Sequence, residues 1–426
     1  MNPGQHLPVV GFAGMTHLGL VSAAATAAKG FTVVGVDPDA QRIDAVTAGR
    51  LPISEPELEE LLAAARPHLQ FSADWAAMSA CDLVYVAMDV PTDESGSSNL
   101  APVRSLIGEI LKVLRSDALL VVLCQVPPGF TRALPVPPER LFYQVETLIF
   151  GRAVERANWP ERFTIGCAAP DAPLPPALHT VLAAFGCPVL PMRYESAELA
   201  KIAINCCLMA SVTVSNTLAG LCEKIGADWG EILPALKLDR RIGPYSYLAP
   251  GLGLAGGNLE RDLATVRQLA LETGCEASLI EAFLTGSRDR RDWVLRLLHR
   301  ELLAEAPKAR IGVLGLAYKE NTDSTKNSPS LALIEHLHPW PIRVFDPVVP
   351  ASVLSHPAVS PVNSAAEVAT GVDALVVMTP WPEFRDLDLR ELRERMRGRL
   401  LVDPFRVFDA AAAAAAGLSY RTLGRS

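Results

Sequence analysis

The chain has 426 residues, half of them hydrophobic, and a formal net charge of -8. This length suits two or three packed domains, and the acidic balance disfavours sequence-independent binding to nucleic acid or to anionic lipid. No apolar run reaches about 18 residues and no basic-then-apolar leader opens the chain, so we expect neither a membrane span nor a signal peptide.

The cysteine pattern bears on metal binding and on the cellular compartment. The chain has eight cysteines, and no pair has C-x-x-C spacing, so neither a zinc site nor a redox dithiol is indicated. Scattered cysteines are typical of a reducing cytoplasm. We therefore expect a cytoplasmic protein without a bound metal.

The N-terminal part alternates strand-like and helix-like segments. An apolar strand at 7–13 leads into an alanine-rich helix, Leu20 to Lys29, which Gly30 is well placed to cap. Further strands are predicted at 31–37, 82–88, 118–124, 163–167 and 188–190. The proline-rich stretch 169–178 is predicted to be a surface loop. This alternation favours a doubly wound α/β sheet.

The middle of the chain has helical periodicity. A long helix is predicted from about Ser196 to near Gly226, followed by a glycine-rich loop at 250–257 and helices at 263–272 and 278–301. The long helix is a natural dimer surface.

A second α/β pattern completes the chain. It comprises strands within 309–318, 342–347, 373–380 and 399–404, a helix at 329–337, and a short surface helix in the seven-alanine run 410–416. The predicted architecture is two Rossmann-like, doubly wound parallel-sheet domains, residues 1–192 and 301–426, joined by a central helical dimerisation domain, residues 193–300.

A dinucleotide fingerprint lies between the first strand and the first helix. The glycines of G-x-G-x-x-G let backbone N–H groups approach a pyrophosphate at the positive end of a helix. Here the second glycine is replaced by Thr16, whose side chain narrows that approach. The motif reads Gly14, Met15, Thr16, His17, Leu18 and Gly19.

An acid closes the second strand, Asp37, 23 residues beyond Gly14. A carboxylate there accepts hydrogen bonds from ribose hydroxyls and repels a 2′-phosphate, which favours NAD over NADP. Arg42 and Gln125 complete the predicted cofactor-binding residues. The alternative is a Rossmann-shaped domain that no longer holds a cofactor.

Several motifs are distributed over nearly the whole chain: 18–39, VPPGFTR (126–132), ELAKIAIN (198–205), 241–257 with RDL (261–263), LGLAYKENTD (314–323) and VFDP (344–347). Together they resemble the UDP-glucose/GDP-mannose dehydrogenase family. The resemblance implies an NAD-dependent enzyme, a dimer or higher oligomer formed by the middle helix, and a C-terminal domain that binds the nucleotide. It also implies oxidation of the C6 alcohol of a nucleotide sugar to a carboxylate by two hydride transfers.

The family's chemistry requires an oxyanion holder, a thiol and a water-activating carboxylate. The thiolate adds to the aldehyde, and the thiohemiacetal is oxidised to a thioester that water cleaves. Lys201 and Asn205 match the family's catalytic lysine and asparagine, and their i, i+4 spacing puts both on one helix face, where they can hold an oxyanion. The alternative for Lys201 is a surface lysine, but the flanking NCCLMAS is too apolar for an exposed face.

Other candidate residues follow from the same resemblance. Asp262 matches the family's aspartate that positions water and the lysine, although a first-turn helix aspartate is an equal alternative. Glu146 matches the first glutamate of P-E-F-L-x-E. Arg241 matches an arginine that reaches substrate across the dimer, or it is simply exposed. The remaining predicted substrate-binding residues are Tyr247, Gly256, Gly257, Lys319 and Lys326.

The departures from the family pattern concern the thioester. Asn258 stands where the family loop G-F-G-G-S-C-F-P-K-D has its cysteine, and Phe150 replaces the second glutamate of E-F-L-x-E. Gln125 replaces a threonine, and Lys326 replaces an arginine and so loses its bidentate geometry. The family's D-G-R-N has become DPFR at 403–406.

These losses suggest that covalent catalysis has been abandoned while one hydride transfer survives. Such an enzyme would stop at the C6 aldehyde, or return the hydride after rearrangement at C5. A full dehydrogenase that oxidises the aldehyde hydrate and a non-catalytic homologue remain as alternatives.

Overall fold

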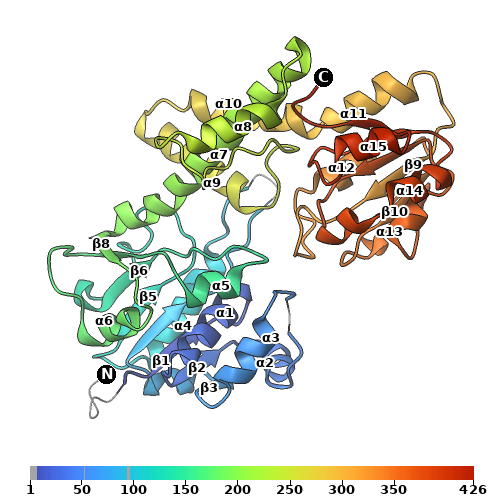
Figure 1. Cartoon of the computed structure of the whole chain (residues 1–426). Helices are drawn as coiled ribbons and strands as arrows, with labels where there is room; N and C mark the ends of the chain where they lie inside the picture. The colour runs from blue at the N-terminus through green and yellow to red at the C-terminus, as the bar shows by residue number, and fades with distance from the viewer. Residues whose placement is uncertain (1–6, 52, 94–95) are drawn as a thin grey trace. The chain divides into compact units, whose positions relative to one another are not determined.

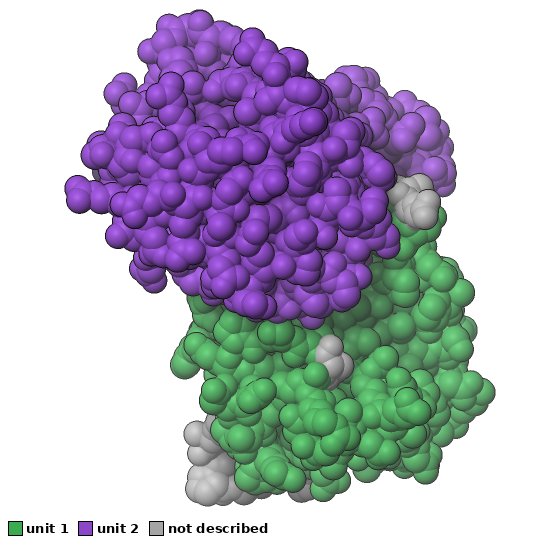
Figure 2. All heavy atoms as spheres, turned by 90° about the vertical axis from the view of Figure 1, so that its right-hand side faces the viewer, with its two compact units in different colours: residues 1–204 green, residues 205–426 purple. Residues whose placement is uncertain are grey.

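The computed structural model describes residues 7–426 except 52, 94 and 95. The chain forms two compact units, Met1–Ile204 and Asn205–Ser426, which Figure 2 colours green and purple. Each unit is described by itself, and the predicted division into three domains, with boundaries after residues 192 and 300, stays a prediction.

The first unit contains an eight-stranded sheet in the order β3-β2-β1-β4-β5-β6-β7-β8 (Figure 1). All neighbouring strands are parallel except β6 and β7. The central strand β1 pairs through Val10 with Val33 on one side and with Leu83 on the other. The strands are β1 Val10–Ala13, β2 Val33–Val36, β3 Leu69–Ser72, β4 Leu83–Val86, β5 Leu119–Val122, β6 Leu141–Gln144, β7 Phe163–Cys167 and β8 Val189–Arg193.

Helices cover both faces of this sheet. Apolar residues of α1 and α6 pack with one face, and those of α4 pack with the other, because residues next to each other on a strand point to opposite sides. The prediction of a doubly wound sheet is thus confirmed for this unit. The helices are α1 His17–Ala28, α2 Ala40–Thr47, α3 Leu58–Ala65, α4 Ala101–Val113, α5 Ala153–Asn158 and α6 Pro176–Ala183. The predicted loop at 169–178 is shorter than expected, since α6 begins at Pro176.

A helical region follows the first sheet. The long helix α7, Tyr194–Ile225, begins in the first unit and continues into the second, and it is followed by α8 Trp229–Leu238, α9 Asn258–Thr273 and α10 Ser278–Arg291. The predicted single helix 278–301 is wrong: it breaks at Asp292 and continues as α11, Trp293–Leu298, and a π-helical turn, His299–Leu303.

The second sheet has six parallel strands in the order β11-β10-β9-β12-β13-β14. Its strands are β9 Ile311–Leu314, β10 Ile342–Phe345, β11 Val359–Pro361, β12 Ala374–Val377, β13 Leu400–Val402 and β14 Ser419–Arg421. The associated helices are α12 Pro329–His336, α13 Ala365–Val368, α14 Leu389–Arg395 and α15 Ala410–Ala415. The predicted fold class, two Rossmann-like sheets with a central helical region, is confirmed.

Within the described residues, α7 is the helix long and apolar enough to cross a membrane by length and composition. The sequence of α7 has no uninterrupted apolar run of that length, but an 18-residue stretch of the helix is apolar on average and contains few charged residues. A third of that stretch (33%) is buried in the single chain. Core helices of soluble proteins can have the same length and composition, so these two properties alone are weak evidence for a membrane span.

Candidate active site

The loop between β1 and α1 requires two of its glycines. Gly14 has φ of 97°, and a Cβ there would stand 2.8 Å from the Cβ of Met88. A Cβ on Gly19 would come within 1.7 Å of the Gly14 carbonyl oxygen. The first and third glycines of the fingerprint therefore allow the turn and the close contact of helix and strand.

The side chains of this loop differ in direction. Thr16 is the N-cap of α1, but its hydroxyl accepts a hydrogen bond from the backbone N–H of Asp89 at 3.0 Å rather than capping the helix. His17 and Leu18 are buried. The first backbone N–H groups of α1 remain the natural anion-binding feature of the loop.

Asp37 closes β2 and is only 2% exposed. Its Oδ2 accepts hydrogen bonds from the Met15 backbone N–H and from Arg42 Nη1, each at 2.7 Å. Its Oδ1 accepts from the Asp39 N–H at 3.0 Å. The carboxylate thus fixes the fingerprint loop, and the structure brings the predicted residues Asp37 and Arg42 together with it.

A cavity of about 320 Å³ lies beside these residues. Carboxylate, guanidinium and apolar walls together fit an adenosine moiety, whose ribose needs acceptors and whose base needs flat apolar contacts. Gln125 is buried just beyond β5 and does not line it. The lining combines Gly14, Thr16, Asp37, Pro38 and Arg42 with Trp75, Met88, Pro102, Ser105, Leu106 and Glu109. Pro38 and the last six were not predicted, although the i, i+4 spacing of Pro102 and Leu106 on α4 was a signal.

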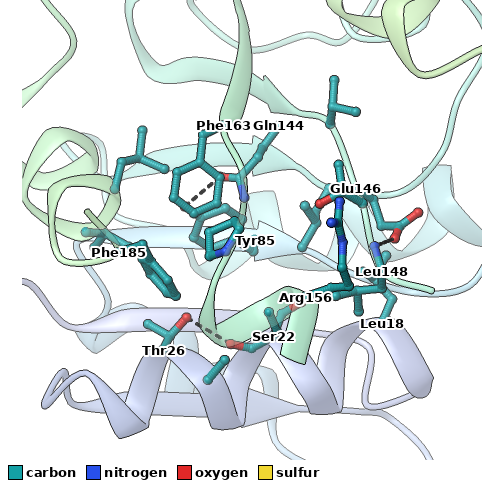
Figure 3. Close-up of a pocket in the computed structure, with 18 of the residues that line it drawn as sticks. Leu18, Ser22, Thr26, Tyr85, Gln144, Glu146, Leu148, Arg156, Phe163 and Phe185 are labelled. Atoms are coloured by element: carbon teal, nitrogen blue, oxygen red, sulfur yellow. Dashed lines mark hydrogen bonds between the residues drawn. The ribbon is translucent and has the colours of Figure 1, made fainter. Parts of the chain in front are cut away.

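A second cavity, of about 60 Å³, lies between α1 and the strands of the sheet (Figure 3). Its volume suits a few water molecules rather than a cofactor. The Tyr85 hydroxyl donates to Gln144 Oε1 at 3.2 Å in its wall. The labelled lining residues are Leu18, Ser22, Thr26, Tyr85, Gln144, Glu146, Leu148, Arg156, Phe163 and Phe185. The loop that follows β6 therefore borders this cavity and carries Glu146.

Lys201 and Glu146 form an ion pair within the first unit. The Lys201 Nζ lies 3.3 Å from Glu146 Oε2, and both side chains are largely buried. Glu146 also accepts a hydrogen bond from the Leu148 backbone N–H. The structure brings together two residues that the sequence suggested separately, one on α7 and one after β6.

Asn205 lies one turn after Lys201 on α7 and belongs to the second unit. Its Nδ2 donates to Asp262 Oδ2 at 2.5 Å, and Asp262, on α9, is only 1% exposed. Arg261 Nε lies 4.0 Å from the other carboxylate oxygen. This second predicted pair is therefore buried and hydrogen-bonded.

The loop before α9 is held at two points. The Gly251 N–H donates to Asn216 Oδ1 at 2.8 Å, and the Leu254 N–H donates to Ser287 Oγ at 2.7 Å. Asn258 is the first residue of α9, and its side chain lies outside the described part of the structure. Neither Asn216 nor Ser287 was predicted.

Four predicted substrate-binding residues gather around this loop. The Gly256 N–H donates to the Lys326 carbonyl at 3.1 Å, and the Lys326 side chain lies beside Gly257. Asn327 donates to the Gly256 carbonyl at 2.9 Å. A Cβ on Gly256 would stand 3.0 Å from the Tyr318 ring, and the Lys319 ammonium lies 5.7 Å from that ring's centroid. Tyr318 and Asn327 were missed.

Arg241 and Tyr247 stand apart from that group. The Arg241 guanidinium pairs with Asp239 at 2.6 Å, and its side chain is 88% exposed. Tyr247 is 49% exposed. In the single chain these side chains face solvent, so their predicted role stays a proposal.

Family comparisons cover all three predicted regions. Residues 9–172 match the NAD-binding domain of the UDP-glucose/GDP-mannose dehydrogenase family, residues 195–286 its central domain, and residues 312–410 its UDP-binding domain. These matches fit the cofactor cavity in the first unit and the second α/β sheet.

Individual relatives agree over nearly the full length. UDP-glucose 6-dehydrogenases of Rhizobium meliloti and Pseudomonas aeruginosa are 31% and 30% identical, covering 97% of this chain and 98% and 96% of theirs. The structure of a UDP-glucose dehydrogenase from Pyrobaculum islandicum is 27% identical, with a TM-score of 0.88 and complete coverage of both chains. The chain belongs to the UDP-glucose/GDP-mannose dehydrogenase family of NAD-dependent nucleotide-sugar dehydrogenases.

Proposed function

We propose that this protein oxidises the C6 primary alcohol of a UDP-sugar with NAD, without a covalent thioester step. The observation that carries the proposal is Asn258 at the position of the family's cysteine, while Lys201 and Asn205 keep buried carboxylate partners. An amide is not a nucleophile at neutral pH, so it cannot form a thiohemiacetal.

The nearby thiols give no substitute. Cys206 packs against an apolar cluster that includes Met209 and Leu263. Burial raises the pKa of the Cys206 thiol, and the negative charge of Asp262 raises it further. A protonated thiol is a poor nucleophile. Cys207 is exposed on the same helix. These features support a reaction that does not pass through sulfur.

The retained residues suit the alcohol–aldehyde step. Bound NAD supplies the hydride acceptor, and the loop from Gly14 to Gly19 with Asp37 and Arg42 would hold it. The Lys201 cation and the Asn205 amide, on one face of α7, would stabilise the alkoxide. Glu146 holds the lysine, and Asp262 holds the asparagine.

The product follows from what is missing. Without a thiol the aldehyde is not trapped, and Phe150, in place of a carboxylate, cannot activate water. The enzyme would release the aldehyde, or return the hydride after proton loss at C5, which the adjacent carbonyl acidifies. Oxidation of the aldehyde hydrate to the acid is the alternative that the names of the relatives favour.

Product analysis tests this proposal. The purified chain is incubated with NAD and a panel of nucleotide sugars that begins with UDP-glucose, and the products are analysed by mass spectrometry. We expect the mass of the aldehyde, or a C5 epimer that has the mass of the substrate and is separated from it by chromatography before the mass is measured. Efficient formation of the uronate would overturn the proposal, and a protein that binds NAD but oxidises no nucleotide sugar would be a non-catalytic homologue.

We also propose a cytoplasmic homodimer formed through α7. Apolar side chains at helical spacing are exposed on it: Val214 at 57%, Leu218 at 41%, Leu221 at 51% and Ile225 at 66%. A continuous exposed apolar stripe on one helix is typical of an interface between copies. Light scattering should therefore give the dimer mass for the wild type and the monomer mass for Leu218→Glu. A wild type that stays monomeric would refute this.

A further inference from the structure

Glu55 is a buried carboxylate to which the sequence assigned no role. It lies between α2 and α3, and its side chain has no exposed surface (0%). Burial of the carboxylate opposes its ionisation, but hydrogen bonds from His17 and from the backbone of Ala153 and Gly151 outweigh that effect and lower the pKa of Glu55. A buried carboxylate is stable only when it is hydrogen-bonded, and Glu55 has three donors, so its place in the fold is specific.

The donors come from two distant segments. His17 Nε2 lies 3.1 Å from Glu55 Oε2, so His17 with its proton on Nε2 donates a hydrogen bond to the carboxylate. The Gly151 N–H donates to the same oxygen at 3.0 Å, and the Ala153 N–H donates to Oε1 at 2.7 Å. Glu55 therefore ties the first residue of α1 to the start of α5.

These two segments also touch each other directly. The Phe150 ring stacks on the His17 imidazole, with centroids 4.2 Å apart and planes 16° from parallel. The contact and the carboxylate together fix residues 150–153 on the first turn of α1. That turn presents the N–H groups suited to a pyrophosphate.

The same loop carries Glu146 at its other end. Glu146 pairs with Lys201 at 3.3 Å and accepts from the Leu148 N–H. The path from Glu55 to this pair is thus the short loop 147–150. Movement of the loop on α1 would displace the carboxylate that holds Lys201.

We propose that Glu55 is a positioning residue that couples the cofactor helix α1 to the Glu146 loop, so that NAD binding and the orientation of Lys201 depend on one buried carboxylate. This role rests on the proposed function for its effect on turnover, but not for its effect on NAD binding. A carboxylate is needed because three donors converge on it. A glutamine would turn an NH₂ group toward at least one of them.

Glu55→Gln tests the proposal against a matched control, Asp82→Asn. Asp82 likewise accepts a backbone N–H, from Val9 at 2.8 Å, and an arginine, Arg115, at 2.8 Å. It precedes β4 at the amino edge of the same sheet, the edge opposite the fingerprint loop. Both substitutions remove a carboxylate from the first unit, but only Glu55→Gln removes one that links α1 to the Glu146 loop.

The measurements are NAD affinity by calorimetry, amide hydrogen exchange, and kcat and KM with UDP-glucose. Glu55→Gln should weaken NAD binding and lower kcat by about tenfold each, the loss expected for one hydrogen-bonded charge. Exchange at Gly151 and Ala153 should accelerate. Asp82→Asn should keep NAD affinity and kcat within about twofold of wild type, the range of a structural surface change.

Glu55→Asp serves as a second variant if Glu55→Gln does not fold, because it keeps the charge but not the reach. A Glu55 variant that binds NAD as tightly as Asp82→Asn, although exchange at Gly151 and Ala153 is fast, overturns the proposal. If the wild type binds NAD but oxidises no nucleotide sugar, the proposed function fails, while binding and exchange still decide the role of Glu55.

Discussion

The two α/β sheets contain the same turn after their first strand, but the surroundings of that turn differ between the sheets. Gly14 after β1 and Gly315 after β9 have φ of 97° and 96°, and each N–H donates to the end of the neighbouring strand at 2.8 Å. In each sheet an acid after the second strand, Asp37 or Asp346, accepts from the backbone N–H that follows the glycine.

The acids differ in what else they hold. Asp346 accepts from the N–H groups of Leu316, Ala317, Val348 and Val349 and from the Trp381 indole, so five donors converge on it. Asp37 faces a cavity of about 320 Å³.

The helices differ as well. α1 begins three positions after Gly14, whereas α12 begins only at Pro329, with Ser328 as its N-cap. A dinucleotide site needs an acid in the wall of a cavity and a helix N-terminus close to the loop. The turn of the first sheet therefore adjoins a cavity and a helix N-terminus, whereas the acid of the second sheet is occupied by donors of the protein itself.

The largest expected effect is on kcat, and it distinguishes a residue of the chemical step from a residue that binds the substrate. Lys201→Ala should lower kcat by about 100- to 1,000-fold, the usual loss for an oxyanion-stabilising group. Lys319→Ala, in the second unit, should mainly raise KM for the nucleotide sugar. Steady-state kinetics measure both, and an unchanged kcat in Lys201→Ala would refute the proposed role.

Next in size is the structural role of Asp346. Asp346→Ala leaves backbone N–H groups without their acceptor, so it should lower the free energy of unfolding by about 2–4 kcal/mol. Thermal denaturation checks this. NAD affinity should not change, and a loss of affinity comparable to that of an Asp37 variant would break the distinction between the two acids.

Asp37→Ser should change the cofactor preference, and it should also loosen the fingerprint loop because Asp37 accepts from the Met15 N–H. It removes the ribose acceptor and the charge that repels a 2′-phosphate, and Arg42 loses its partner, so the preference for NAD over NADP should fall by about tenfold or more. Calorimetry with each dinucleotide measures the ratio. An unchanged preference would mean that discrimination arises elsewhere in the cavity.

The smallest expected effect is that of Asn258→Cys. A thiol introduced at the start of α9 should not by itself produce the uronate, because Phe150 occupies the position that the resemblance assigns to a glutamate. Mass spectrometry of the product decides this. Acid formation in the single variant, with none in Asn258→Ser, would show that the cysteine alone had been missing.

Sequence patterns revealed the elements with strong local signals. The fingerprint, Asp37 and the end of α7 before Gly226 were predictable because glycine, acid and apolar periodicity act within a few residues. Helix α8 was missed because Pro234 lies inside it, and the break at Asp292 has no proline or glycine to announce it.

Long-range partners were beyond the sequence. Lys201 and Glu146 were each suggested, but their pairing depends on how β6 and α7 pack. Glu55 lies in an irregular segment, and its partners are 38 and more residues away. Such contacts are set by tertiary packing, which has no period along the chain.

The distribution of the free thiols has a practical consequence for labelling. Cys207 and Cys275 are exposed, whereas burial raises the pKa of Cys81 and of Cys124 to about 12. A maleimide dye reacts with accessible thiolates. In the proposed homodimer it would react first with Cys275, because Cys207 lies seven residues before Val214 on the exposed apolar stripe of α7. Cofactor binding to the first unit could then be followed from a label in the second unit, because the least buried thiol of the first unit, Cys187, is half-buried and burial raises its pKa.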